Sequence, residues 1–227
     1  MSYRTPFAQD EWYHCYNRGV DKRKIFRTKS DYERFLALMY VGNGTHPVHL
    51  SNLSSTKLHD VLLDISLDKG ELLVDIGTYA LMPNHFHFLL KETTENGISM
   101  FLQKITTGYT MYFNKKQQRT GALVAGPFKS KHVSDDKYIK QLISYIHLNP
   151  VELHEPRWKQ GIGNITSIEK YLHQYNYSGL SDFSGVKRPE NKIVSDSLSL
   201  LFDAKPNTQK MLEDAKAYYE EFIKASP

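Results

Sequence analysis

Residues 79–90 read Tyr79-Ala80-Leu81-Met82-Pro83-Asn84-His85-Phe86-His87-Phe88-Leu89-Leu90, two apolar runs separated by a turn signal. Proline followed by asparagine favours a turn, so the stretch predicts a β-hairpin with strands over about 72–82 and 85–91. Side chains alternate along a strand, which places His85 and His87 on one face and the intervening phenylalanines on the other. We expect the phenylalanine face to join the core.

The segments around this hairpin alternate between strand and helix patterns. An aromatic run over 12–18 predicts a strand, and an amphipathic helix is expected over 31–41, with Ser30 as N-cap and Glu33 completing a capping box. Residues 42–70 are interpreted as an insertion or long loop because Gly, Asn, Ser, Thr and His dominate their first half. The other expected elements are a helix over 98–116, an interrupted strand over 123–133, a helix from 136 that ends before Pro150, and a final helix within 206–223.

The predicted order of elements is β, α, β, β, α, β, α, followed by a C-terminal extension. Strands mixed with helices in this order, with one tight hairpin among them, indicate the α+β class. We expect an antiparallel or mixed sheet with helices on one face.

The overall composition suits a globular chain. Its 227 residues are 40% hydrophobic and 12% aromatic, enough to bury a core. No apolar run is long enough for a transmembrane helix, and residues 1–10 lack the apolar region of a secretory signal. A single cysteine, Cys15, excludes a disulfide framework and a cysteine-rich zinc site. We therefore expect a soluble, cytoplasmic protein that does not associate with membranes.

The positive charge is concentrated in one segment. The chain carries +4, yet residues 101–150 hold 8 Lys+Arg against 2 Asp+Glu, while the segments before and after are each −1. Cations interleaved with aromatics suit the phosphates and bases of single-stranded nucleic acid. The alternative is that the aromatics belong to the core and the cations form a solvated helix face. We favour this alternative for the aromatics and the nucleic-acid role for the cations. The basic side chains concerned are Lys104, Lys115, Lys116, Arg119, Lys129 and Lys131.

Two residue pairs have the types that carry chemistry. Two imidazoles on one strand face, His85 and His87, can bind one cation; a pair of partly exposed surface histidines is the alternative. Tyr145 and Asn149 are four residues apart on the helix that ends before Pro150, so they share a face. A hydroxyl beside a carboxamide oxygen suits a nucleophile next to a metal ligand. A core tyrosine bonded to a helix-terminal asparagine is the alternative interpretation.

Several further motifs accompany these pairs over residues 12–155. They are Tyr13-His14, Asn17-Arg18-Gly19, Ile25-Phe26, Asp31-Tyr32, Phe35, Tyr109-Thr110, Tyr112-Phe113-Asn114, Gly121, Phe128-Lys129-Ser130 and Tyr145-Ile146-His147-Leu148-Asn149-Pro150-Val151. Together with residues 79–90, they resemble the HUH single-tyrosine transposases, in particular the branch of REP-associated tyrosine transposases. The sequence departs from that pattern in the length of 42–70 and in Pro127, where many relatives have arginine.

The resemblance implies a ferredoxin-like antiparallel sheet and a role for each matching residue. His85 and His87 match the metal-binding histidines, Tyr145 matches the catalytic tyrosine, and Asn149 stands where relatives supply a third metal ligand. Arg18 joins the six basic side chains named above as a predicted DNA contact. The implied cofactor is Mg²⁺, with Mn²⁺ also suited to nitrogen ligands. Residues 1–155 would form the catalytic domain and 156–227 an extension whose role the sequence does not indicate.

The implied activity is that of a DNA transposase. Tyr145 would cleave and rejoin hairpin-bearing single-stranded DNA through a 5′-phosphotyrosine intermediate, with His147 as a possible proton acceptor. Two alternatives are a domesticated protein that binds hairpin DNA without cutting it, and a metal-dependent nuclease that uses water as nucleophile. The sequence does not distinguish a monomer from a homodimer, and it does not specify the hairpin.

Overall fold

A four-stranded antiparallel sheet forms the centre of the molecule. The computed structural model describes residues 6–158, 164–202 and 205–224. The spatial order of the strands is β2-β3-β1-β4, and each neighbouring pair is antiparallel. The strands are β1 (Trp12–Arg18), β2 (Val74–Met82), β3 (His85–Glu92) and β4 (Lys129–His132).

The helices within the described ranges include the four that were predicted, together with four shorter additional ones. They are α1 (Lys29–Gly42), α2 (Leu58–Leu63), α3 (Gly97–Lys116), α4 (Asp136–Leu148), α5 (Val151–His154), α6 (Ile165–Gln174), α7 (Leu180–Phe183) and α8 (Thr208–Tyr218). The predicted ones are α1, α3, α4 and α8. The α+β class and the antiparallel sheet are therefore confirmed. None of the helices in the described ranges is both long and apolar enough to cross a bilayer.

Local details of two predicted elements differ from expectation. The N-cap of α1 is Thr28 rather than Ser30, because Asp31 reaches back to the backbone N–H of Thr28 at 2.9 Å and completes the capping box. The segment 42–70 contains α2, whose Val61 and Leu62 are buried in the core shared with α1. It is thus a packed insertion rather than a plain loop.

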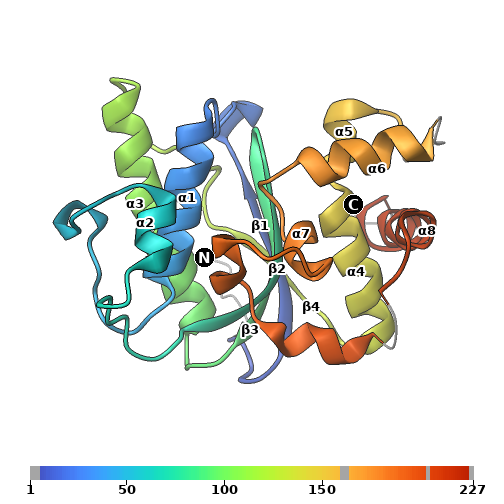
Figure 1. The fold of residues 1–227 in the computed structure, drawn as a ribbon, viewed down its shortest axis with the longest axis horizontal. Coiled ribbons are helices and arrows are strands. Elements are labelled where there is room, and N and C mark those ends of the chain that lie inside the picture. The colour runs from blue at the N-terminus through green and yellow to red at the C-terminus, as the bar shows by residue number, and fades with distance from the viewer. Residues whose placement is uncertain (1–5, 159–163, 203–204, 225–227) are drawn as a thin grey trace.

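One face of the sheet packs against α1 and α3 (Figure 1). Phe86 and Phe88 of β3 are fully buried there, in contact with Phe35 of α1, and Phe101 of α3 packs against Phe88. The predicted alternation along the hairpin is therefore confirmed on its apolar side.

The second face of the sheet is covered by α4 and by helices of the C-terminal extension (Figure 1). Leu142 and Ile146 of α4 share a buried cluster with Leu89 of β3 and Leu212 of α8. The helices thus extend beyond the one face that the element order predicts. The cause is the apolar surface that both α4 and the extension present, which needs a partner to be buried against.

The extension is also hydrogen-bonded to the edge strand β2. The backbone N–H of Leu81 donates to Tyr177 O at 2.9 Å, and that of Gly179 donates to Tyr79 O at 2.9 Å. An edge strand left open exposes unpaired backbone groups, so these bonds both anchor the extension and close the edge.

A buried ion pair holds this region in place, and its removal gives our first stability prediction. The Arg188 guanidinium donates to Asp182 Oδ1 at 2.9 Å and to Ser178 O at 2.8 Å, and the Asp182 side chain is only 3% exposed. Arg188→Met leaves that carboxylate buried without its cation, so we expect a loss of about 3–5 kcal/mol in the free energy of unfolding. Urea denaturation measures it. A double variant, Arg188→Met with Asp182→Leu, should recover part of the loss; a single-variant loss below about 1 kcal/mol would contradict the assignment.

Candidate active site

The two histidines of the hairpin lie side by side on the face of the sheet that α4 covers. Their ring centroids are 5.1 Å apart and the rings are nearly perpendicular. In the register with β1, His85 is opposite Arg18 and His87 is opposite Tyr16, so these four side chains share one face. The pairing of His85 and His87 on a single face, predicted from strand alternation, is confirmed.

Each of these histidines has its Nδ1 atom in a hydrogen bond. Nδ1 of His85 lies 2.7 Å from Asn84 Oδ1, and Nδ1 of His87 lies 2.8 Å from Nε2 of His14. An amide oxygen only accepts, so His85 carries its hydrogen on Nδ1 and its lone pair on Nε2. Metal-binding histidines commonly donate their other ring N–H to an oxygen in this way, so His85 fits a metal ligand.

The described residues around the histidine pair offer few further ligands for such a cation. Over the parts of the chain that the structure describes, no three His, Cys, Asp or Glu side chains are grouped as a metal site. A cation at the histidine pair would therefore need amide, water or phosphate oxygens to complete its coordination, which suits Mg²⁺ or Mn²⁺ better than a closed structural zinc site.

Tyr145 of α4 lies directly beside the histidine pair. Its ring centroid is 5.6 Å from that of His87 and 4.8 Å from that of Tyr218, and its side chain is 5% exposed. Burial raises the pKa of the Tyr145 phenol, while a hydrogen bond from the Asn149 side chain opposes the shift. The phenol is therefore neutral at pH 7.

Asn149 ends α4 and is held against Tyr145. Its Nδ2 donates to the backbone oxygen of Tyr145 at 2.9 Å, and the residue is buried. The expected sharing of one helix face by Tyr145 and Asn149 agrees with this contact. The role of Asn149 as a metal ligand stays a prediction.

His147 lies on a different side of α4 from Tyr145. Its Nε2 atom is 2.6 Å from Thr78 Oγ1, and its ring packs against Phe183 of α7. Complete burial lowers the pKa of His147 to about 3, so the ring is neutral. This placement does not support a role as proton acceptor for Tyr145, because two residues along a helix turn the side chain well away from the tyrosine.

The buried neutral state of His147 predicts acid sensitivity. In the unfolded chain a histidine titrates near its ordinary pKa of 6.5, whereas the folded pKa of about 3 keeps the ring uncharged. The stabilisation is therefore complete above pH 6.5 and is lost as the pH falls toward 3, by about 2 kcal/mol between pH 7 and pH 5. His147→Gln, which cannot titrate, should flatten the pH dependence of the unfolding free energy by that amount. Urea denaturation at both pH values tests it, and an unchanged slope would contradict it.

A cavity of 380 Å³ opens beside the histidine pair. Its charged side chains are all cationic, namely Arg18, Lys22 and Lys129, and no carboxylate is among the residues around it. The lining consists of Tyr16, Asn17, Arg18, Lys22, Asn84, His85, His87, Ala125 and Lys129. A cavity with cations and two imidazoles suits a polyanion.

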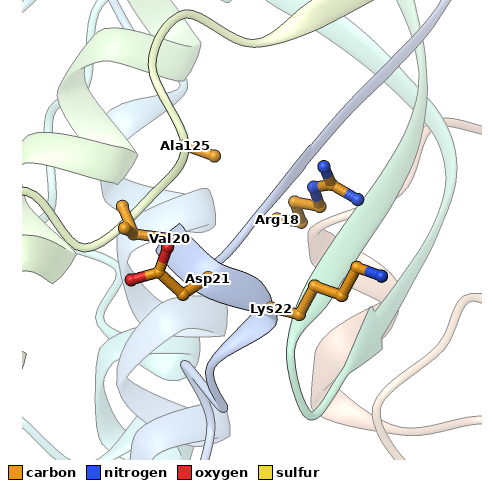
Figure 2. A pocket seen from close by; sticks show the side chains of 5 residues that line it. All are labelled: Arg18, Val20, Asp21, Lys22 and Ala125. Carbon is orange, nitrogen blue, oxygen red and sulfur yellow. The ribbon is translucent and has the colours of Figure 1, made fainter.

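A second cavity of 460 Å³ adjoins the first and shares three of its residues (Figure 2). Arg18 and Lys22 extend their cationic ends to the same side, whereas the carboxylate of Asp21 points away from them (Figure 2). Asp21 instead pairs with Arg23 at 3.3 Å. The backbone at Asp21 and Lys22 is left-handed, with φ values of 54° and 57°, and this tight turn brings Lys22 back toward the end of β1.

The predicted DNA-binding residues fall into two groups on opposite sides of the sheet. Lys129 and Lys131 of β4 stand opposite Tyr16 and His14 in the register, on the histidine face. Lys104, Lys115 and Lys116 lie on α3, behind the other face, and Arg119 follows that helix and donates to Ala122 O at 2.9 Å.

Two of the lysines on α3 are already engaged within the protein. Lys116 Nζ lies 2.6 Å from Asp31 Oδ1, a fully buried carboxylate, and Lys104 Nζ donates to Gly44 O at 2.5 Å. These bonds give both lysines structural roles. The structure therefore places only Arg18, Lys129 and Lys131 of the predicted contacts around the histidine pair.

Several residues of the site were not predicted as site residues, and three of them bear on its chemistry. Lys22 lines both cavities, His14 bonds to His87, and Tyr218 of α8 covers Tyr145. Strand alternation could have indicated His14, because it precedes Tyr16 and Arg18 by even steps on β1. Tyr218 carries no comparable signal, since its position depends on how the extension folds back.

Comparison with known proteins identifies the family and supports the fold. The family profile described as "Transposase IS200 like" matches residues 10–149. The fold is similar to a solved structure of a REP-associated tyrosine transposase bound to a REP hairpin, with 12% sequence identity and a TM-score of 0.50. That match covers 84% of this chain and 90% of the other. No curated protein matches the sequence significantly. Because the profile spans more than half of the sequence, the chain belongs to the IS200-like transposase family.

Proposed function

We propose that this transposase cleaves and rejoins hairpin-bearing single-stranded DNA through a 5′-phosphotyrosine on Tyr145. The observation that carries the proposal is the position of the Tyr145 ring, 5.6 Å from that of His87, which in turn lines a cavity whose charged side chains are all cationic. A metal-dependent nucleophile needs those neighbours: imidazoles for the cation and positive charge for the DNA backbone. The hairpin-bound structural neighbour supports the choice of substrate.

His85 and His87 would hold a divalent cation through their Nε2 atoms, with Asn149 as the proposed third protein ligand. Mg²⁺ is the expected ion and Mn²⁺ should bind more tightly to the two nitrogens. When bound, the cation would supply Lewis-acid polarisation of a non-bridging oxygen of the scissile phosphate.

Tyr145 would attack the scissile phosphorus with its phenolic oxygen. The new bond joins Oη to phosphorus, the bond to the 3′-oxygen breaks, and the leaving oxygen ends as a 3′-hydroxyl after gaining a proton. The phenol loses one proton in the same step, so the overall count of protons is unchanged. Burial keeps the phenol protonated before attack, and a phosphotyrosine preserves the energy of the phosphodiester for rejoining to a second 3′-hydroxyl.

The DNA strand would cross the histidine face between β1 and β4. Arg18, Lys22 and Lys129 line the cavity there, and Lys131 lies farther along β4. The α3 lysines lie off this path. When cationic side chains neutralise DNA phosphates, the binding affinity falls as salt is added. The salt dependence of binding therefore shows which lysines contact the DNA.

Lys129→Ala should reduce the salt dependence of DNA binding. Because single strands release about 0.7 counterion per neutralised phosphate, the slope of log K against log salt should fall by about 0.7 in magnitude. Fluorescence anisotropy with a labelled hairpin oligonucleotide at several salt concentrations measures it. Lys115→Ala, an exposed lysine on α3, is the matched control and should leave the slope unchanged. If Lys115→Ala produces the larger change, the DNA follows the other side of the molecule.

Trapping the covalent adduct tests the proposed reaction. Protein, labelled hairpin oligonucleotide and Mg²⁺ or Mn²⁺ are mixed and separated on a denaturing gel. We expect a labelled band at the mass of protein plus cleaved strand. A cleaved but unattached strand would instead indicate a nuclease that uses water, and a shift on a native gel without cleavage would indicate a binding protein. Either result overturns the phosphotyrosine step.

A further inference from the structure

His14 of β1 connects the proposed metal site to the C-terminal extension. Its ring is 1% exposed and lies between two partners on the second face of the sheet. Nε2 of His14 is 2.8 Å from Nδ1 of His87, and Nδ1 of His14 is 3.0 Å from the hydroxyl of Tyr218. The reaction described above gives His14 no part.

The direction of these two hydrogen bonds decides which nitrogen of His87 has a lone pair. A neutral imidazole carries one N–H and one lone pair, so a bond at one nitrogen fixes what the other can do. If Tyr218 donates to His14, then His14 donates to His87, and the hydrogen of His87 resides on Nε2. Such a ring cannot ligate a cation through Nε2.

The opposite direction gives a metal-binding ring. His87 then donates from Nδ1 to Nε2 of His14, and His14 donates from its own Nδ1 to the phenolic oxygen of Tyr218. Nε2 of His87 has its lone pair in this state. His85 has the same tautomer, with its hydrogen on Nδ1 and its lone pair on Nε2. In this case the cause is a single contact, because Asn84 Oδ1 can only accept a hydrogen bond from Nδ1.

We propose that His14 is a positioning residue for the metal site, which sets the tautomer and the ring orientation of His87 by accepting its Nδ1 hydrogen. Tyr218 completes the chain as the acceptor for His14, so helix α8 supplies part of the support for a ligand on β3. The proposal rests on the metal-binding role of His87 given under the proposed function.

The packing around His14 supports a fixed orientation. The rings of His14 and His87 stack at 5.1 Å, and Tyr16 stacks on His87 from the same strand face at 5.6 Å. The ring of Tyr218 lies 6.0 Å from that of His14. Because the His87 ring is already hydrogen-bonded and stacked, it loses little rotational freedom when a cation binds. Residues that hold a ligand in this way raise the metal affinity without contacting the metal.

Four variants separate hydrogen bonding from packing. His14→Leu removes both nitrogens, whereas His14→Gln places an amide oxygen where Nε2 lies and can still accept from His87. Tyr218→Phe keeps the ring and removes the acceptor. His147→Leu is the matched control, because His147 is equally buried and bonds to the single hydroxyl of Thr78 away from the site.

The first readout is Mn²⁺ affinity of the full chain without DNA, followed by electron paramagnetic resonance of free Mn²⁺. We expect His14→Leu to weaken binding about 10- to 100-fold. His14→Gln should stay within about threefold of wild type, and Tyr218→Phe should fall between the two. The His147→Leu control should bind Mn²⁺ normally even where it lowers the melting temperature as much as His14→Leu.

The second readout is the tautomer of His87 in the metal-free protein, from long-range ¹⁵N–¹H correlation spectra. We expect the hydrogen on Nδ1 in the wild type and a mixture of tautomers in His14→Leu. A wild-type His87 with its hydrogen on Nε2 would overturn the proposal, as would His14→Leu that binds Mn²⁺ like wild type. If His87 is not a metal ligand at all, the proposed function fails rather than the role of His14. In that case His87→Ala would bind Mn²⁺ as well as the wild type does.

Discussion

Tyr145→Phe is expected to abolish the covalent protein–DNA adduct while binding of a hairpin oligonucleotide stays within about threefold of wild type. The reason is that phenylalanine keeps the ring packed between His87 and Tyr218 and removes only the nucleophilic oxygen. Loss of the nucleophile leaves no attacking atom, so adduct formation should drop below detection rather than by a modest factor. The adduct is measured on a denaturing gel and binding by anisotropy.

Tyr109→Phe is the matched control for that experiment. Tyr109 is a second buried tyrosine, and it lies across the sheet on α3, where it donates to Ile25 O at 2.5 Å. The variant should therefore form adduct at the wild-type rate. If Tyr145→Phe still forms the adduct, Tyr16 beside His87 is the next candidate and the assignment of Tyr145 is wrong.

His87→Ala has the second largest expected effect, a loss of about 10³-fold in the rate of strand cleavage. A divalent cation stabilises developing charge on the phosphate by several kcal/mol, and about 4 kcal/mol corresponds to that factor. One imidazole, His85, would remain, so high Mn²⁺ should restore part of the rate. Single-turnover cleavage across a Mn²⁺ titration measures both effects.

His132→Ala is the control for the loss of a histidine. His132 lies on β4 and bonds to Glu11 at the surface, 2.9 Å from its carboxylate, so its removal should leave cleavage unchanged. Cleavage by His87→Ala at the wild-type rate and with the wild-type metal requirement would contradict a metal role for the histidine pair.

Much of the fold could be predicted from the sequence because short-range patterns determine it. The Pro83-Asn84 turn and strand alternation indicated the hairpin and the face of each histidine, and apolar periodicity located α1, α3 and α4. The extension could not be placed in this way. Its position depends on contacts between residues far apart in the chain, such as the backbone pairing of Tyr177 with Leu81 and of Gly179 with Tyr79.

Residue spacing could predict which candidate side chains share a face, because each pair lies on one element. Spacing placed His85 with His87, and Tyr145 with Asn149, on common faces, whereas their roles in metal binding and attack come from the family resemblance and stay predictions. Charge counted along the chain does not separate the lysines of α3, which lie behind one face of the sheet, from Lys129 and Lys131 of β4, whose side chains point to the other face. His14 and Tyr218 are 204 residues apart in the chain, and only the fold brings them together.

Mapping the covalent bond tests the central claim most directly. Wild-type protein is reacted with a hairpin oligonucleotide in Mn²⁺, digested with nuclease and protease, and its peptides are analysed by mass spectrometry. The proposed function predicts a nucleotide remnant joined through a 5′-phosphate to the peptide that contains Tyr145. A remnant on another tyrosine, or cleaved DNA with no modified peptide, would contradict it.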